Sequence, residues 1–306
     1  MNDTSPTDQI LPAAVPLLGA AEAAAALGAS LHLRRDGTTV QPELSARLDA
    51  VLDALGVRDA LKALDAHETA ALLGIVEGFL TQAADFVARP GRSAWDHEDS
   101  RILMAQGHTS ALVAAVLQRF VLPSLGEDLT TRMESAGASF LDVGAGVAAL
   151  AVAMCRLWPS LQVVGIDPWE PALVLAQQQV AAAGLQERIE LRQTTAEALE
   201  DCDEFDLAWV PTFFIPSAVL EQAIGRVHAA LRPGGWAILG LYARPGNPFI
   251  DALADLRTVR QGGSLRTPQE LATSLKHAGF SDTGIHFGAE WNLPVVFVTG
   301  RRSVAP

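Results

Sequence analysis

Through the first part of the chain, apolar residues recur every three or four positions, which is the spacing of an amphipathic helix. Two of these segments end at residues that stop helices, Gly56 and Arg89-Pro90-Gly91. We therefore predict that residues 17–135 are helical almost throughout, with a polar, charged loop at 92–100. The helices expected there span residues 42–56, 67–91 and about 101–121.

From Ser139 onward, short apolar runs alternate with helical segments, a pattern typical of a mostly parallel sheet with helices on both faces. The last two expected strands are joined by a short loop around Trp291, which predicts an antiparallel hairpin at the sheet edge. The expected strands are 139–143, 162–166, 188–192, 205–210, 235–242, 283–288 and 293–299, and the expected helices are 147–157, 170–183, 217–231, 249–256 and 268–278.

This pattern predicts an α/β fold with two domains. A helical N-terminal region over residues 1–135 precedes a Rossmann-like sheet domain over 136–306, mostly parallel and closed by the antiparallel hairpin.

Composition narrows the classes of partner. A net charge of −13 opposes binding to nucleic acid or to an anionic membrane, and 49% hydrophobic residues are typical of a filled globular core. The first ten residues carry no Lys or Arg, and Pro12 and Pro16 interrupt the apolar stretch that follows, so we expect neither a signal peptide nor a membrane span. Cys155 and Cys202 lack metal-ligand spacing. We expect a cytoplasmic protein with no metal site and a small-molecule partner.

The stretch SFLDVGAGVAALAVAM (139–154) joins the first strand to a helix through Gly144 and Gly146. Such a turn presents free backbone N–H groups and lets the main chain approach a ligand closely. Together with Ala149 it satisfies a dinucleotide-binding fingerprint, and Asp167 follows at the end of the second strand, where an acid binds ribose hydroxyls. These residues alone fit a nicotinamide or flavin enzyme as well as other adenosine ligands.

Three features favour a different ligand. Asp142 lies directly before the glycines, where an acid suits a ligand with a positive end rather than a pyrophosphate. The segment LRPGGW (231–236) places a Pro-Gly-Gly turn before the fifth strand. The antiparallel closing hairpin is the third feature.

With these features, the chain resembles the class I S-adenosylmethionine-dependent methyltransferases over roughly residues 136–300. The resemblance implies S-adenosyl-L-methionine as cofactor, with Asp142 near its methionine end and Asp167 on its ribose. Trp169 is expected to pack against the adenine. The full set of implied cofactor-binding residues is Asp142, Gly144, Ala145, Gly146, Asp167, Pro168, Trp169, Thr195, Ala196 and Trp209.

Two positions depart from the family pattern. Thr195 stands where an acid usually binds the adenine amino group, so its hydroxyl and the Ala196 amide are expected to serve instead. Ala148 replaces a small glycine, which is tolerable if that residue is already helical.

Aromatic residues after the fourth and fifth strands suggest where an acceptor binds, at the carboxyl ends of the strands. A flat, largely apolar molecule stacks well on such side chains, so we expect a small aromatic natural product, methylated on O, N or an electron-rich carbon. Trp209 is also expected near the mouth of this site. The candidate acceptor-binding residues are Trp95, Pro211, Phe213, Phe214, Arg244 and Trp291.

For proton removal, the candidate catalytic residues are His97, His108 and Tyr242. His97 lies between Asp96 and Glu98, and a neighbouring carboxylate raises the basicity of an imidazole. His108 follows Gly107 in a segment that, by the resemblance, folds over the cofactor as a lid.

Two other functions remain open from the sequence. One is an NAD- or FAD-dependent oxidoreductase, and the other is a methyltransferase-like binding module without turnover. For the methyltransferase, the helical N-terminal region is expected to cover the active site and is a candidate surface for pairing two subunits as a homodimer.

Overall fold

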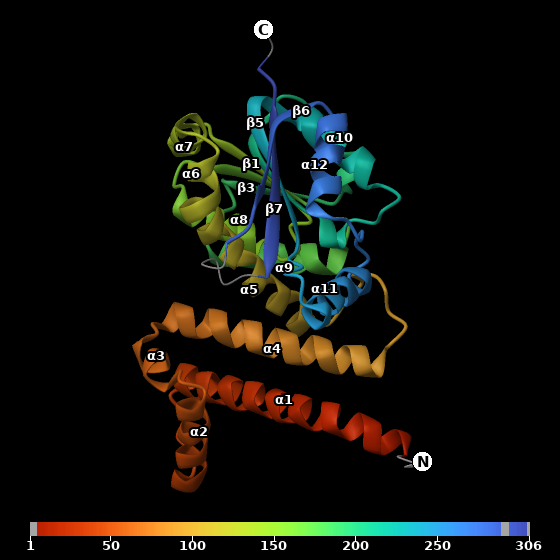
Figure 1. Cartoon of the computed structure of the whole chain (residues 1–306). Coiled ribbons are helices and arrows are strands. Elements are labelled where there is room, and N and C mark those ends of the chain that lie inside the picture. The colour runs from red at the N-terminus through yellow and green to blue at the C-terminus, as the bar shows by residue number, and fades with distance from the viewer. Residues whose placement is uncertain (1–4, 289–293, 305–306) are drawn as a thin grey trace. The chain divides into compact units, whose positions relative to one another are not determined.

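The computed structural model describes residues 5–288 and 294–304, and its chain divides into two compact units. The helical unit comprises the chain up to Pro90 together with Met104–Thr109. The sheet unit comprises Gly91–Leu103 and the chain from Ser110 onward. This division differs from the expected boundary at 135/136, because residues 110–135 pack with the sheet (Figure 1).

The helical unit is built from four helices and a segment of a fifth, α5. They are α1 (Pro6–Asp36), α2 (Pro42–Ala54), α3 (Arg58–Ala63), α4 (Ala66–Ala88) and residues 104–109 of α5 (Ser100–Val116). Helix α1 begins well before the predicted residue 17, because Ser5 and Asp8 form a capping box and Pro6 occupies the first turn. As expected, α4 ends just before Arg89-Pro90-Gly91.

Small residues allow close helix packing within this unit. A Cβ added at Gly28 of α1 would lie 3.1 Å from Val76 of α4, so these two helices approach closely there. A Cβ at Gly78 of α4 would lie 2.6 Å from the Cβ of Ala105 on α5. Gly74 and Gly78 lie four residues apart on α4, and together they form the surface on which residues 104–109 pack.

The sheet unit holds a seven-stranded sheet in the order β3-β2-β1-β4-β5-β7-β6. Strand β7 is antiparallel to both of its neighbours, and the other neighbouring pairs are parallel. The predicted fold class and closing hairpin are therefore confirmed. The strands are β1 (Ser139–Val143), β2 (Gln162–Ile166), β3 (Ile189–Arg192), β4 (Phe205–Pro211), β5 (Leu231–Tyr242), β6 (Phe280–His286) and β7 (Val295–Arg302).

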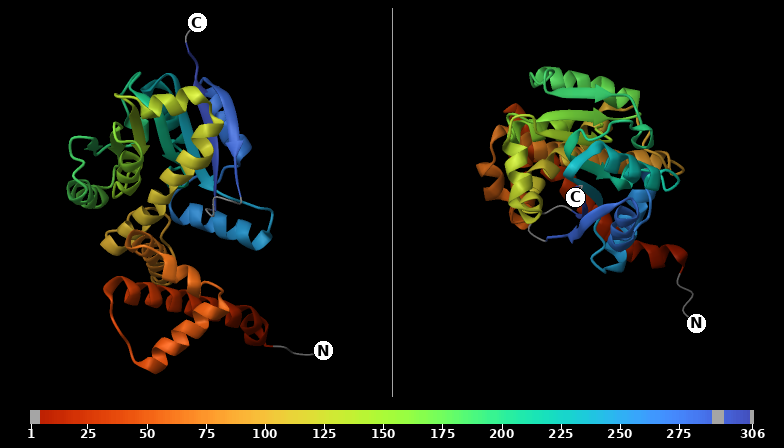
Figure 2. Two further views of the ribbon diagram at one scale, coloured as in Figure 1. Left: turned by 90° about the vertical axis from the view of Figure 1, so that its left-hand side faces the viewer. Right: turned by 90° about the horizontal axis from the view of Figure 1, so that it is seen from above.

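Helices cover both faces of this sheet and bury a core on each (Figures 1 and 2). Phe140, Leu207 and Phe297 point into the core shared with α5 to α9. Leu141, Val210 and Val298 point into the core shared with α10 and α12. The helices that follow α5 are a π-helical turn (Leu117–Val121), α6 (Leu122–Ser124), α7 (Glu127–Glu134), α8 (Ala149–Leu157), α9 (Glu170–Ala182), α10 (Leu220–Ala230), α11 (Pro248–Arg260) and α12 (Pro268–His277).

The Pro-Gly-Gly segment lies inside β5 instead of preceding it. Leu231 pairs with Phe205 of β4, and the pairing resumes at Trp236 after an irregularity. A Cβ at Gly235 would lie 2.9 Å from the carbonyl oxygen of Phe205, so a side chain there would collide with β4. Gly234 has φ of +81°, which glycine adopts without strain.

Two helices in the described part of the chain are long and apolar enough to cross a membrane, Pro6–Asp36 and Glu68–Ala88. Pro12 and Pro16, which argued against a span, lie inside α1 without ending it. A core helix of a globular protein meets the same two criteria. The absence of a membrane partner and the cytoplasmic location therefore stay predictions.

Candidate functional site

The glycine turn after β1 has the backbone geometry that the sequence predicts. Gly144 and Gly146 have φ of +67° and +55°. The N–H groups of Gly144 and Ala145 both donate to the carbonyl of Ile166, at 2.8 and 3.0 Å, which fixes the turn against the end of β2. A Cβ at Gly146 would meet only the Gly144 carbonyl oxygen, at 4.0 Å, so the space beside that residue is open to a ligand.

Asp167 follows β2 and binds this turn directly. Its carboxylate accepts from the backbone N–H of Gly146 and from that of Trp169, each at 2.8 Å. The carboxyl is buried, and burial raises its pKa while the two backbone donors act in the opposite direction. The expected ribose acid therefore lies against the glycine turn, with the exposed Pro168 and the half-buried Trp169 beside it.

Asp142, the last polar residue of β1, is 1% exposed. It is in register with Gly165 of β2 and with Trp209 of β4. Its Oδ2 has no hydrogen-bond partner among the described residues. Burial, with a contribution from the charge of Asp167, raises the pKa of Asp142 to about 8, and the backbone N–H of Ala151 offsets part of this. Asp142 therefore holds a proton at neutral pH, and a cationic ligand beside it would favour its ionised form.

Ala148 corrects one sequence expectation. It is not helical but left-handed, with φ of +60° and ψ of +21°, and it precedes the first residue of α8. An alanine in this conformation is strained by roughly 1–2 kcal/mol. Ala148 is fully buried in the core of the sheet unit, and in this environment it adopts the backbone conformation that a glycine would adopt without strain.

Thr195 and Ala196 lie just beyond β3, which adjoins β2 in the sheet. Thr195 is half-buried and precedes a short 3-10 turn that starts at the buried Ala196. Their proposed contact with adenine stays a prediction. Trp209 is 4% exposed, and its ring lies over Gly240. The rings of Trp209 and Phe297 meet edge to face with their centroids 5.7 Å apart, so Trp209 belongs largely to the sheet core.

We call Trp95, Phe213, Phe214 and Tyr242 the aromatic wall. Their rings form a continuous row in which neighbouring centroids are 4.7 to 5.0 Å apart. Phe213 stacks on Tyr242, with 22° between the ring planes. Pro211 directly precedes the 3-10 turn that carries Phe213 and Phe214, and it lies against the glycine turn, since a Cβ at Gly144 would lie 3.4 Å from its Cγ. The fold brings these residues together from three segments that are far apart in the chain.

His97 extends the aromatic wall but is not arranged as expected. Its ring lies 4.7 Å from that of Trp95, and its Nδ1 accepts from Arg92 Nη1 at 2.7 Å. Asp96, the expected orienting carboxylate, instead pairs with Arg92 Nε at 2.9 Å. Arginine only donates, so Nδ1 must be the acceptor and the proton of a neutral His97 lies on Nε2.

Tyr242 and Arg244 are also held by neighbours. The Tyr242 hydroxyl donates to Gln261 Oε1 at 2.9 Å, and burial raises the pKa of Tyr242. Arg244 pairs with Asp255 of α11 at 2.5 Å. The Tyr242 phenol is thus held as a hydrogen-bond donor, and its catalytic role stays a prediction.

Two further candidates lie elsewhere. His108 belongs to the helical unit, where its ring occupies the space beside Gly74, since a Cβ there would lie 1.8 Å from its Nδ1. That position accounts for His108 by packing, and its catalytic and lid roles stay predictions. Trp291 lies outside the described residues.

Sequence reasoning missed the groups that hold the aromatic wall in place. A Cβ at Gly262 would lie 3.4 Å from Ala94, and one at Gly263 would lie 2.3 Å from the Phe213 carbonyl oxygen. The loop carrying Trp95 and the turn carrying Phe213 therefore both pack on this glycine pair. The Gly262-Gly263 pair after α11 can be recognised in the sequence as a turn, but nothing in the sequence indicates which segments it contacts.

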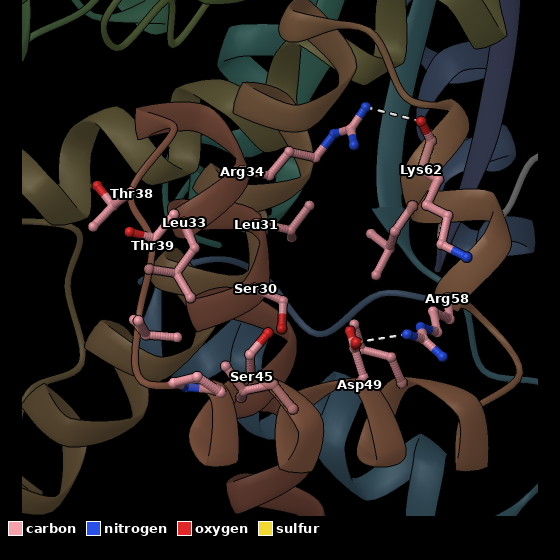
Figure 3. Close-up of a pocket in the computed structure, with 15 residues that line it drawn as sticks. Ser30, Leu31, Leu33, Arg34, Thr38, Thr39, Ser45, Asp49, Arg58 and Lys62 are labelled. Atoms are coloured by element: carbon pink, nitrogen blue, oxygen red, sulfur yellow. Dashed lines mark hydrogen bonds and ion pairs between the residues drawn. The ribbon is translucent and has the colours of Figure 1, made fainter.

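The helical unit has a cavity of about 510 Å³, bounded by the end of α1 and by α2 and α3 (Figure 3). Leu31 is one of the residues that line it, Arg34 donates to the Lys62 carbonyl, and Arg58 pairs with Asp49. None of the predicted site residues lines it. Within residues 5–288 and 294–304, no group of three or more His, Cys, Asp or Glu side chains is placed to hold a metal ion.

Residues 140–235 match the family model described as a methyltransferase domain. A curated relative, the ubiquinone biosynthesis O-methyltransferase of Rhodopseudomonas palustris, is 27% identical over 172 residues, which cover 52% of this chain and 66% of that protein. The alignments span between about half and two thirds of the length of the curated relatives.

Two solved structures share the fold over nearly the whole chain. The pyocyanin biosynthetic protein PhzM matches with a TM-score of 0.66 at 15% identity, over 97% of this chain and 98% of its own. The S-adenosylmethionine-dependent methyltransferase SibL matches with a TM-score of 0.62 at 23% identity, over 96% of this chain and 99% of its own. The shared fold therefore includes the N-terminal helices.

Proposed function

We propose that this chain, whose residues 140–235 form a class I S-adenosylmethionine-dependent methyltransferase domain, methylates a small acceptor with a flat aromatic ring. The domain match and the strand order confirm the resemblance seen in the sequence. The strand order also disfavours the oxidoreductase alternative, because a doubly wound dinucleotide-binding sheet has no antiparallel strand between its fifth and sixth. The observation that carries the proposal is the juxtaposition of the glycine turn with the aromatic wall through Pro211.

The residues of the turn fit this cofactor. Asp142 is buried with an unpartnered Oδ2, and a positive charge such as that at the methionine end of the sulfonium cofactor would favour its ionised form. The space beside Gly146 admits a ligand against the main chain, and Asp167 is placed to accept from ribose hydroxyls. When bound, S-adenosylmethionine supplies an electrophilic methyl carbon on a sulfonium.

The chain's own contribution is alignment. Phe213 and Tyr242 stack on each other and form a rigid part of the aromatic wall, and the bond from Tyr242 to Gln261 fixes the Tyr242 ring, so a planar acceptor is proposed to pack against this wall. We propose an acceptor whose nucleophile needs little help in losing a proton, because the Tyr242 hydroxyl donates to Gln261 and Arg92 donates to His97 Nδ1. Phenolates, amines and electron-rich ring carbons meet that requirement.

A binding assay followed by a methyl-transfer screen tests this function. S-adenosylhomocysteine should raise the melting temperature of the chain and NAD should not. Transfer of labelled methyl groups should then occur to members of a panel of phenols, indoles and aromatic amines, and not to fatty acids. Transfer confined to aliphatic acids or protein side chains would refute the aromatic acceptor, and tight binding without any transfer would favour a non-catalytic module.

We also propose that the N-terminal helices pair two subunits. The first half of α1 is exposed on the helical unit and carries large apolar side chains, which are costly to leave in water. Replacing Leu11 and Leu18 by Asp should convert a dimer to a monomer in sedimentation velocity, while Phe249→Asp on α11 should not. The exposed apolar residues are Ile10, Leu11, Val15, Leu17 and Leu18.

A further inference from the structure

Trp169 joins two parts of the sheet unit that no motif connects. Its backbone N–H donates to Asp167 Oδ1 at 2.8 Å, and its indole Nε1 donates to the backbone carbonyl of His97 at 2.7 Å. One residue thus contacts both the expected ribose acid and the loop at 92–99, which we call the tryptophan loop. The two ends of this connection lie 72 residues apart in the chain.

The tryptophan loop is internally braced. Arg92 bonds His97 through Nη1 and Asp96 through Nε, and the ring of Trp95 rests on that of His97. His97 itself is 4% exposed. With its side chains tied to one another, the loop is expected to shift as a single piece rather than residue by residue.

The same loop forms the end of the aromatic wall. The rings of Trp95 and Phe214 have centroids 5.0 Å apart, and the loop backbone packs on Gly262. A continuous series of contacts therefore runs from Asp167 through Trp169 and the tryptophan loop to Phe214.

We propose that Trp169 is a positioning residue that couples occupation of the cofactor site to ordering of the acceptor-facing tryptophan loop. This inference rests on the proposed function, since it takes the ligand at Asp167 to be the adenosine moiety of the cofactor. The indole is half-buried in the structure, so a base stacked beside it fixes the ring and strengthens its bond to the His97 carbonyl. By reciprocity, a loop already bonded to the indole holds the ring ready for the cofactor.

The consequence is a preferred order of binding. The aromatic wall is already formed in the structure, and the cofactor stabilises the loop that completes it, so the acceptor binds more tightly once the cofactor is bound. The coupling resides in one hydrogen bond, and the net strength of such a bond limits the coupling to about a tenfold change in an equilibrium.

Hydrogen–deuterium exchange with S-adenosylhomocysteine as the probe tests this coupling without knowledge of the acceptor. In the native chain, saturating probe should slow exchange in the glycine turn and, by about tenfold, in residues 93–98. In Trp169→Phe, which keeps an aromatic ring but lacks the donor, the turn should still be protected and residues 93–98 should not. Gln193→Ala is the matched control, because it also removes a side-chain hydrogen bond beside the cofactor site. The lost bond is a long one, 3.5 Å, to the carbonyl of Pro168, the residue before Trp169, and the variant should behave as the native chain.

The outcomes separate the two proposals. Protection of the turn without protection of residues 93–98 in the native chain would overturn the coupling and leave the methyltransferase function standing. Equal protection of the loop in the native chain and in Trp169→Phe would overturn the role of the indole. Absence of protection at the turn would count against the proposed function itself.

Discussion

The cofactor half of the site and the aromatic wall are built in different ways. The cofactor half uses backbone N–H groups and two carboxylates, drawn from one turn and the end of the next strand. The aromatic wall uses side chains from three segments, which are residues 92–99, 213–214 and Tyr242. A site made from the main chain depends on a few irreplaceable conformations, whereas a wall of side chains can be repacked. The first half should therefore be far less tolerant of substitution.

The largest expected effect is from Gly146→Leu in the cofactor half. The side chain would occupy the space beside the turn and prevent the ligand from approaching the main chain. We expect no measurable binding of S-adenosylhomocysteine by calorimetry, with the far-ultraviolet circular dichroism unchanged.

Gly184→Leu is the matched control for backbone strain. Gly184 has φ of +67°, close to that of Gly146, and a Cβ there would meet nothing within 4 Å. It should lose similar stability and keep full binding. Binding retained by Gly146→Leu would mean that the turn holds no cofactor.

The second effect is from Asp167→Ala, which should weaken binding of S-adenosylhomocysteine by about 2–3 kcal/mol, or roughly 30- to 150-fold. The ribose would lose a charged acceptor, and the N–H groups of Gly146 and Trp169 would lose theirs. Asp201→Ala removes a carboxylate that pairs with Arg192 at 2.6 Å near β3, and should leave the affinity unchanged. Equal losses in both variants would indicate a general electrostatic effect instead.

These expectations follow the half of the site that could be read from the sequence. Gly144, Gly146, Asp142 and Asp167 were identified because strand, turn and acid are consecutive, and the structure brings them together as predicted. The aromatic wall was recognised only as a set of residue types. Its geometry depends on the Gly262-Gly263 contacts and on Arg92, which are tertiary and leave no periodic trace.

The sequence predicted the bounds of buried strands better than it predicted the partners of individual side chains. Strands β1 and β2 have the predicted bounds, because buried strands are bounded by clear turns. His97 was interpreted through its chain neighbours Asp96 and Glu98, yet its partner is Arg92, five residues away. His108 was interpreted through Gly107, yet its position is set by Gly74 on another helix. Adjacent residues are poor guides to the partners of a side chain.

The third effect is a pH dependence from Asp142. Its pKa is about 8 in the folded protein against an ordinary value near 3.8, so between these two pH values the folded protein holds a proton that the unfolded chain has lost. A cationic ligand requires the ionised form and releases that proton. Affinity for S-adenosylmethionine should therefore rise by up to about tenfold per pH unit between pH 6 and 8 and then level off.

Without cofactor, the stability of the folded protein should fall as the pH rises, whereas the affinity for S-adenosylmethionine rises. Over the same range the free energy of unfolding should fall by up to about 1.4 kcal/mol per pH unit, because ionising a buried, unpartnered carboxyl disfavours the folded state. Asp142→Asn should remove both slopes in denaturant titrations and in binding assays at pH 6, 7 and 8. Slopes that persist in this variant would assign them to other groups.

The smallest effect distinguishes the turn from the helix that follows it. Ala151 and Ala148 are both fully buried, but Ala151 lies inside α8 and Ala148 is left-handed. Ala151→Gly should cost about 2 kcal/mol, from the lost methyl burial and the poor helix propensity of glycine. Ala148→Gly loses a similar methyl group but relieves roughly 1–2 kcal/mol of left-handed strain, so its net change should be under about 1 kcal/mol. If urea titrations give equal losses for the two variants, Ala148 has the helical conformation that the sequence suggested. Unequal losses would show that this turn holds its ligand-binding shape against the preference of its own residue.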